Sequence, residues 1–370
     1  ARTLGEGDRQ KANRIFSLIV YTSIISGVVI IIVGLLLLRP VAIFLGASGD
    51  LLTDSLRYGN IILLAIPAYI LQFAFQSLFI TAEKPRLALA VTVAAGVANM
   101  ILDALLVGVI PLGIEGAAIA TAISQYIGGV VPVIYFLCPN SSLLRLTGTG
   151  PDIRSLIRVC VNGSSELLSN ISMPAVSMIY NAQLLLYAGE NGVAAYGVLM
   201  YVCMIFIAIF IGYSVGIAPV VSYHYGAGNK KRTWECFTFA VKVGTAICLT
   251  FGIFSALFAE EIMWFFCDDA EVALLGTQTL YFLCACIPLM AFSTFVNQLY
   301  QGLGFKLQAT FLASCRQGIF FLPTVFIFPL LLDLTGVQAT QSFADICTFF
   351  ISIPFIIIFY KKYIVGKDSK

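Results

Sequence analysis

Two polar residues one helical turn apart stand inside a long apolar stretch of this chain. Asn99 and Asp103 are four positions apart within the apolar run 87–110, so on a helix they share one face. A carboxylate in the middle of a membrane helix costs about 2.5 to 3.5 kcal/mol on insertion scales, so it is expected to face a cavity or a partner. Amide and carboxylate oxygens suit a small hard cation, and a buried carboxylate can also exchange a proton.

A third oxygen ligand is expected from the next apolar stretch, which carries Thr121 among many small residues. At about 1.5 Å of rise per residue, Asp103 and Thr121 each lie about 10 Å below the outer ends of their helices. We therefore predict a sodium or proton site formed by Asp103, Asn99 and Thr121. The alternative is a structural one, in which hydrogen bonds from Asn99 and nearby backbone hold a buried Asp103 that has no role in function.

The composition places these residues in a membrane. Hydrophobic residues make up 59% of the chain and charged residues 11%, and the mean hydropathy is +0.96, whereas a soluble domain is about a quarter charged. We predict an all-α polytopic membrane protein, because apolar stretches of about 18 residues or more are long enough to cross the hydrocarbon core as helices. Ten such spans are expected, at 15–38, 58–81, 87–110, 114–137, 160–187, 193–220, 235–258, 275–301, 308–332 and 337–360.

An internal repeat organises these spans. The segments that begin at residues 5 and 226 match at a constant offset of 221 positions over roughly 75 residues, and duplicated membrane halves are typical of secondary transporters. The spans at 160–187 and 193–220 have no counterpart before residue 1, so we predict an intact protein of twelve spans in two pseudo-symmetric six-helix bundles. The matched positions include Gly5 with Gly226, Gly7 with Gly228, Ile66-Pro67 with Ile287-Pro288 and Phe44 with Phe265.

The repeat also divides the chain into lobes. Residues 1–137 are expected to form an incomplete N-lobe with four of six helices, and residues 153–370 a complete C-lobe. Between them, 138–152 has the polar, Pro-rich and Gly-rich composition of a linker. After this linker Asp152 is placed to cap a short amphipathic helix at the membrane surface.

Basic residues predict the orientation. The loops on one side of the predicted spans hold 17 of the 21 Lys and Arg residues, while those on the other side hold only Arg39 and Arg57. Since basic loops stay in the cytoplasm, we expect a multi-pass plasma-membrane (inner-membrane) protein with the linker and both termini cytoplasmic.

A second set of polar residues is a candidate substrate path. Glu166 and Arg316 each lie about 10 Å from the cytoplasmic face, so an ion pair between them is expected, whereas Asp345 has no predicted partner. Polar side chains can instead join helices to one another, and this alternative stays open. The residues of the candidate path are Glu166, Arg316, Gln72, Gln76, Asn297 and Gln301.

These motifs resemble those of the multidrug and toxic compound extrusion (MATE) transporters. The resemblance implies antiport of organic compounds against sodium ions or protons. In the DinF-like branch of that family the N-terminal lobe holds a cation site, whose Asn, Asp and Thr fall on Asn99, Asp103 and Thr121; a further Asp of the family would precede residue 1. The resemblance rests on Asn99-x-x-x-Asp103 after Lys84-Pro85, on the string Gly116 to Thr121, on the paired Gly-x-Gly loops, on Cys315-Arg316-Gln317 and on Gln301-Gly302-x-Gly304.

The expected function is secondary-active export of organic, often cationic, compounds by alternating access, with sodium or protons as the coupling ion and no other cofactor. A lipid-linked oligosaccharide flippase or polysaccharide exporter of the same superfamily is the alternative. An intramembrane enzyme is not expected, because the one His stands outside the spans and the carboxylates are scattered. We expect a monomer in the lipid bilayer that binds small organic substrates and no nucleic acid.

Overall fold

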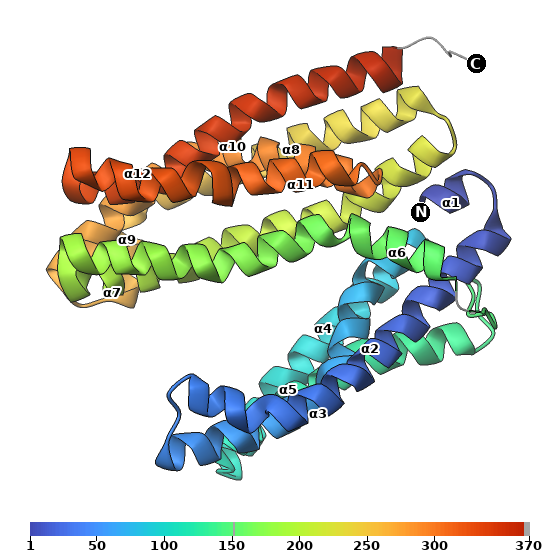
Figure 1. Cartoon of the computed structure of the whole chain (residues 1–370), viewed down its shortest axis with the longest axis horizontal. Coiled ribbons are helices and arrows are strands. Elements are labelled where there is room, and N and C mark those ends of the chain that lie inside the picture. The colour runs from blue at the N-terminus through green and yellow to red at the C-terminus, as the bar shows by residue number, and fades with distance from the viewer. Residues whose placement is uncertain (151, 366–370) are drawn as a thin grey trace. The chain divides into compact units, whose positions relative to one another are not determined.

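The structure is a computed structural model that describes residues 1–150 and 152–365, so Pro151 of the predicted linker and the basic residues Lys367 and Lys370 lie outside the described part. The described chain is helical, as predicted, and contains no strand (Figure 1). The elements are α1 (Arg2–Gly5), α2 (Arg9–Phe44), α3 (Gly49–Thr81), α4 (Pro85–Asp103), η1 (Ala104–Val109), α5 (Gly113–Leu137), α6 (Ile153–Asn162), α7 (Ser164–Gly226), α8 (Lys230–Leu257), α9 (Ala259–Phe266), α10 (Ala270–Gly302), α11 (Lys306–Ser314), η2 (Cys315–Phe320), α12 (Phe321–Phe359) and η3 (Tyr360–Val365), where η marks a π-helical segment.

Eight helices in the described residues are long and apolar enough to cross a membrane, which supports the multi-pass prediction. The 63-residue helix α7 breaks at Gly189, where φ is 63°. The rings of Tyr180 and Tyr196, on either side of this break, lie 4.7 Å apart, so the chain folds back on itself there. The break falls between the predicted spans 160–187 and 193–220.

Helix α12 breaks in the same way at Asp333, where φ is 50°. The rings of Phe328 and Phe343 lie 4.8 Å apart across this break. Again the break falls in the gap between two predicted spans, 308–332 and 337–360. The number of complete membrane crossings, and the twelve-span arrangement of the intact protein, stay predictions.

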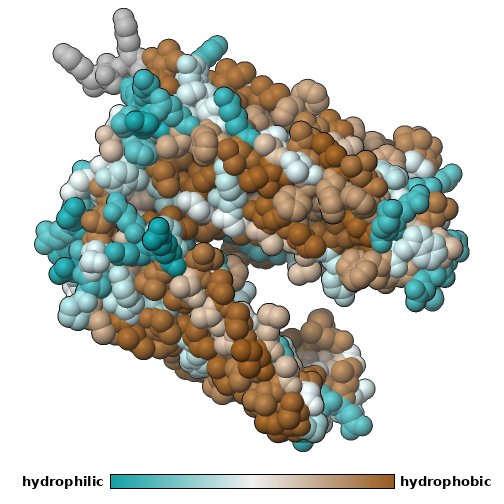
Figure 2. Space-filling model, turned by 180° about the vertical axis from the view of Figure 1, so that it is seen from behind, coloured by the Kyte–Doolittle hydropathy of each residue, from teal (hydrophilic) through white to brown (hydrophobic). Residues whose placement is uncertain are grey.

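The described chain forms two compact units. Unit 1 comprises Gly7–Leu156 with Ala1 and Thr3, and unit 2 runs from Ile157 onward and includes Arg2 and Leu4–Glu6. In both units apolar side chains cover the flanks of the helices, and polar ones gather toward the helix ends (Figure 2). This is the pattern of helices that lie in lipid along their length.

Unit 1 is held together by aromatic packing among α2, α3 and α5. Phe136 of α5 packs against Phe16 at a ring-centroid distance of 4.8 Å and against Phe79 at 5.4 Å, and it stacks on Phe75 at 5.7 Å. All four rings are buried. Aromatic pairs contribute about 0.5 to 1.5 kcal/mol beyond their burial, so this cluster fixes the positions of three helices against one another.

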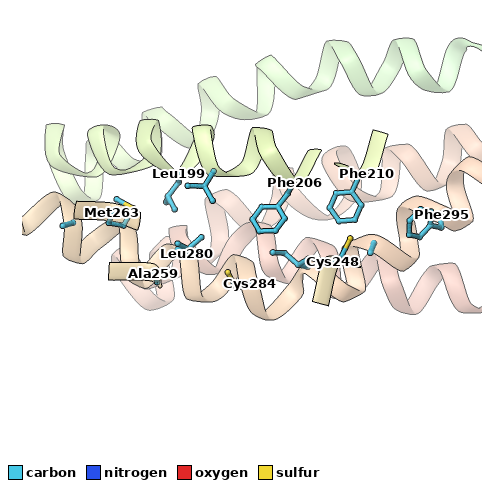
Figure 3. Close-up of a cluster of buried hydrophobic side chains, with 13 residues drawn as sticks. Leu199, Phe206, Phe210, Cys248, Ala259, Met263, Leu280, Cys284 and Phe295 are labelled. Carbon is cyan, nitrogen blue, oxygen red and sulfur yellow. The ribbon is translucent and has the colours of Figure 1, made fainter. Parts of the chain in front are cut away.

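The core of unit 2 lies between α7, α8, α9 and α10 (Figure 3). Phe206 and Phe210 of α7 point toward Cys248 of α8 and Cys284 of α10, and Met263 of α9 closes one end of the cluster. The cysteines behave here as small apolar residues.

The repeated Gly-x-Gly segments meet within unit 2. A side chain on Gly5, at the end of α1, would collide with the carbonyl oxygen of Tyr223, and one on Gly226, at the end of α7, would collide with that of Arg2. Since Arg2 and Tyr223 are themselves 221 positions apart, the contact is reciprocal and follows the offset of the repeat. Glycine is therefore needed at both positions for close backbone approach.

Candidate functional site

Asp103 stands where the backbone changes its helical geometry. It is the last residue of α4, and the π-helical segment η1 (Ala104–Val109) follows it directly. At the junction the amide of Ala104 lies close to the carbonyl oxygens of Ile101 and Met100. Such π-helical segments are rare and occur frequently at functional sites. The change from α-helix to π-helix therefore falls at Asp103, the residue that the sequence predicts to bind the coupling ion.

The three predicted ligands occupy two helices that pack against each other. Asn99 and Asp103 lie on α4 and Thr121 on α5, and all three are half-buried. No hydrogen bond joins them to one another, and Asp103 has no hydrogen-bond or ion-pair partner among the described residues. The structural alternative, in which Asn99 holds Asp103 by a hydrogen bond, therefore does not describe this structure.

Gln125 is a polar residue near this site that the sequence reasoning missed. It lies one turn after Thr121 on α5, so both are on one face of that helix. Its side-chain oxygen is buried and has no hydrogen-bond partner, which is uncommon and calls for an explanation. The four-residue spacing from Thr121, the same spacing that links Asn99 and Asp103, is the signal that could have found it.

Gln72 of α3 packs against α5 about two turns beyond Thr121. Gln72 and Gln76 are half-buried, and a side chain on Gly128 of α5 would collide with the side chain of Gln72. In this structure Gln72 therefore joins two helices of unit 1. That contact fits the helix-joining alternative for Gln72.

Unit 2 contains a buried ion pair that the sequence did not predict. Nε of Arg316 donates to Oδ1 of Asp345 at 2.6 Å, and Nη2 of Arg316 lies 2.9 Å from the sulfur of Met290. The amide of Gln341, one turn before Asp345 on α12, is 3.4 Å from the same carboxylate oxygen. The Asp345 side chain is 4% exposed and that of Arg316 31%, so the pair is largely removed from solvent.

The predicted ion pair between Glu166 and Arg316 is therefore wrong. Glu166 is exposed, and its carboxylate instead accepts a hydrogen bond from the amide of Gln301 at 3.2 Å. Asn162 donates to the backbone oxygen of Gln301 at 3.3 Å. The polar residues of unit 2 thus divide into one group around Arg316 and another at the end of α10.

Several buried polar atoms of unit 2 lack partners. The side-chain oxygens of Asn297 and Gln301 on α10, Asn181 on α7 and Gln317 on η2 are buried without a hydrogen bond. Unpaired acceptors of this kind are available to a bound polar molecule or to water. Among the described residues, no group of three His, Cys, Asp or Glu side chains is arranged to hold a metal ion.

Comparison with known proteins assigns the chain to a family. The family model MatE matches residues 1–105 and 167–327, two stretches whose ends are 222 positions apart, close to the offset of the repeat. The multidrug export protein MepA of Staphylococcus haemolyticus is 26% identical over 373 residues, covering 100% of this chain and 81% of that protein. MepA of Staphylococcus aureus strain RF122 is 26% identical over 349 residues, covering 93% of this chain and 76% of that protein.

Solved structures have the same fold. A multidrug resistance MATE family transporter of the MOP superfamily, in an outward-facing conformation, superposes with a TM-score of 0.92 at 20% identity, covering 99% of this chain and 82% of that one. A MOP superfamily transporter from Pyrococcus furiosus gives a TM-score of 0.90 at 20% identity, covering 98% of this chain and 82% of that one.

Proposed function

Because this chain belongs to the MatE family, we propose that it is a multidrug efflux transporter that exports organic, often cationic, compounds across the membrane in which its helices lie. The MepA proteins that match it along most of its length are named as multidrug export proteins. This match does not favour the alternative of a lipid-linked oligosaccharide flippase or polysaccharide exporter. Membership in a transporter family also supports the expectation that the chain is not an enzyme.

The coupling ion acts at Asp103 in this proposal. The observation that carries the proposal is a half-buried carboxylate without a partner, placed at the start of a π-helical segment. Neutralising this carboxylate, by a sodium ion or by a proton, offsets the cost of holding it away from water. Asn99 and Thr121 supply neutral oxygens for a bound cation, and Gln125 adds an unpaired one.

Coupling to the substrate follows from linkage. If cation binding at Asp103 favours one of two conformations, a substrate that prefers the other conformation is released when the cation binds. Rocking of two bundles would then expose the substrate path alternately to each side of the membrane. We place both termini in the cytoplasm, because basic residues gather on that side of the predicted spans, and we expect a monomer.

The substrate path is proposed to include the polar residues of unit 2. Asn297, Gln301 and Gln317 offer unpaired oxygens, and Arg316 keeps part of its guanidinium exposed beside Asp345. Because the Arg316–Asp345 pair is neutral overall, it can accept either a cationic or an anionic group by exchange of partners. Aromatic residues in the same unit suit flat organic cations.

Reconstitution tests this proposal. The purified protein is placed in liposomes loaded with ethidium, and a sodium gradient or a pH gradient is imposed in turn. We expect ethidium flux above that of protein-free liposomes under at least one gradient, and we expect the matching ionophore, monensin or nigericin, to abolish it. Flux equal to that of protein-free liposomes under both gradients, from protein that is monodisperse by gel filtration, contradicts the proposal.

A further inference from the structure

Helix α6, which contains the boundary between the two compact units, has an apolar face that the described chain leaves largely exposed. None of its ten residues is buried, and Ile153 and Ile157 are 67% and 56% exposed. At 3.6 residues per turn, five of the six apolar side chains fall on one arc of about 140°, and Val159 lies about 60° beyond the edge of this arc at Leu156. The arc consists of Leu156, Cys160, Ile153, Ile157 and Val161 in angular order.

Two arginines border this arc on one side. Arg154 and Arg158 are four positions apart, so they lie one turn from each other along the edge of the apolar face next to Val161. Both are exposed, and neither takes part in an ion pair within the described residues. The helix itself contains no acidic residue. Asp152, just before it, is occupied as a cap by hydrogen bonds from the backbone and the hydroxyl of Ser155 at 3.0 and 2.6 Å.

The chain keeps this helix next to the membrane. Only Gly163 separates α6 from α7, which is apolar enough to span a bilayer. Asn162, the last residue of α6, donates to the backbone oxygen of Gln301 at the end of α10, another candidate membrane helix. The C-terminal end of α6 is therefore fixed where two candidate membrane helices end.

We propose that α6 is a docking helix for anionic phospholipids. Its apolar arc lies in the leaflet on the linker side, and Arg154 and Arg158 bind the headgroup phosphates. A short helix with a wide apolar face bordered by arginines lies in the plane of the membrane interface, and a leaflet rich in anionic lipids attracts exposed arginines near its surface. Charge complementarity and the position beside α7 favour this occupant over a protein partner.

Lipid selectivity tests the role of the arginines. Binding of POPG and POPC to the full-length detergent-solubilised chain is compared by native mass spectrometry. In Arg154→Gln/Arg158→Gln we expect POPG affinity to fall by about fivefold per arginine, with POPC binding unchanged. The matched control is Arg9→Gln/Arg14→Gln, which removes two exposed arginines from α2 and should retain POPG binding. An equal loss in the control means that overall charge alone attracts the lipid, which overturns the proposal.

Fluorescence quenching tests the apolar face independently, and it leaves both arginines in place. In a Trp234→Phe/Trp264→Phe background, Ile157→Trp puts a tryptophan on the apolar arc, and Val159→Trp puts one about 200° away around the same helix. In nanodiscs of POPC and POPG that contain brominated POPC, we expect strong quenching at position 157 and weak quenching at position 159. Equal quenching at both positions, or none at position 157 because a protein partner or a second copy covers it, overturns the proposal.

Discussion

At the scale of single residues, two carboxylates of the described chain differ in burial and pairing. Asp345 in unit 2 is almost fully buried and paired with Arg316, whereas Asp103 in unit 1 is half-buried and unpaired within the described chain. A paired carboxylate already has its charge compensated, and an unpaired one in a membrane helix gains most from a cation or a proton. The two units therefore differ in the role that their acidic residue can take.

The Arg316–Asp345 pair is expected to stabilise unit 2. Removing one partner leaves a buried charge uncompensated, which costs about 3 to 5 kcal/mol for fully buried pairs. Because Arg316 is 31% exposed, we expect a loss near the lower end of that range for Asp345→Asn. Thermal unfolding of the purified protein measures this loss.

The control for this prediction removes both charges. Arg316→Met/Asp345→Leu should recover most of the lost stability, because a neutral apolar pair leaves no unpaired charge. If the double variant is as unstable as the sum of the two single variants, the pair does not act as a unit.

The sequence could identify these charged residues but not their pairing. Depth along a helix follows from counting residues, and on that basis Arg316 and Glu166 stand at a similar level. Pairing also depends on rotation about the helix axis, and Arg316 lies within the π-helical segment η2 (Cys315–Phe320), where the wider turn changes the direction of every side chain relative to an α-helix. Counting in steps of an ideal α-helix cannot reproduce that change.

At the scale of elements, the two halves place their π-helical segments differently. Subtracting the offset of 221 from Cys315–Phe320 gives 94–99, which is regular α-helix, and adding it to Ala104–Val109 gives 325–330, which is regular as well. The repeat thus preserves the order of the helices and not their local geometry. Segment η1 directly follows Asp103, and segment η2 contains Arg316.

Close packing of α3 against α5 depends on a glycine. A side chain on Gly129 would collide with the carbonyl oxygen of Ala68. We expect Gly129→Ala to destabilise the protein by about 1 to 3 kcal/mol, the usual cost of overpacking. Gly96→Ala on α4 is the matched control, because a side chain there meets open space, and it should be neutral or stabilising by up to about 1 kcal/mol. Thermal unfolding that ranks the two variants in the opposite order contradicts this account.

The amphipathic helix α6 should lose its cap in acid. Hydrogen bonds from the side chain and the backbone of Ser155 lower the pKa of Asp152 below its ordinary value. A lowered pKa in the folded state means that the cap contributes stability above the unfolded value of about 3.9, and that this contribution is lost as the pH falls through the lower folded value.

Hydrogen exchange of the α6 amides, corrected for the intrinsic rate, measures this effect. Protection should be higher at about pH 6 than below about pH 4 in the wild type. In Asp152→Ala protection should be low at both values, and a pH dependence that persists in this variant would assign the effect to another group.

At the scale of the whole molecule, the apolar runs of the sequence predicted most of the helices. The breaks at Gly189 and Asp333 fall in gaps between predicted spans because a reversal needs polar or flexible residues, which interrupt an apolar run. The linker bounds 138–152 stay a prediction, whereas the Asp152 cap was predicted from the sequence and is observed. The short helix α9 (Ala259–Phe266) was not predicted, because at eight residues its apolar side chains are too few to distinguish it from the end of the preceding span.

Two natural cysteines test the predicted orientation. Cys138 is exposed at the start of the linker, which we place in the cytoplasm, and Cys267 is half-buried in the loop after α9, which we place outside. In right-side-out vesicles, a membrane-impermeant maleimide should modify a variant that retains only Cys267 and leave a variant that retains only Cys138 unmodified until the membrane is permeabilised. The reverse labelling pattern would place the linker outside the cell and would contradict the predicted orientation.

The effect of Asp103 on gradient-driven export tests the central claim most directly. Ethidium flux is measured in proteoliposomes of the wild type, of Asp103→Asn and of Asp50→Asn. Asp50 is an exposed carboxylate of the same unit, and its replacement by Asn removes the same charge. Coupling energies of ordinary size correspond to effects of about 5- to 150-fold. We predict a loss in this range of the flux that depends on the sodium or pH gradient in Asp103→Asn, and no loss in Asp50→Asn. Gradient-dependent flux that persists unchanged in Asp103→Asn would contradict the account.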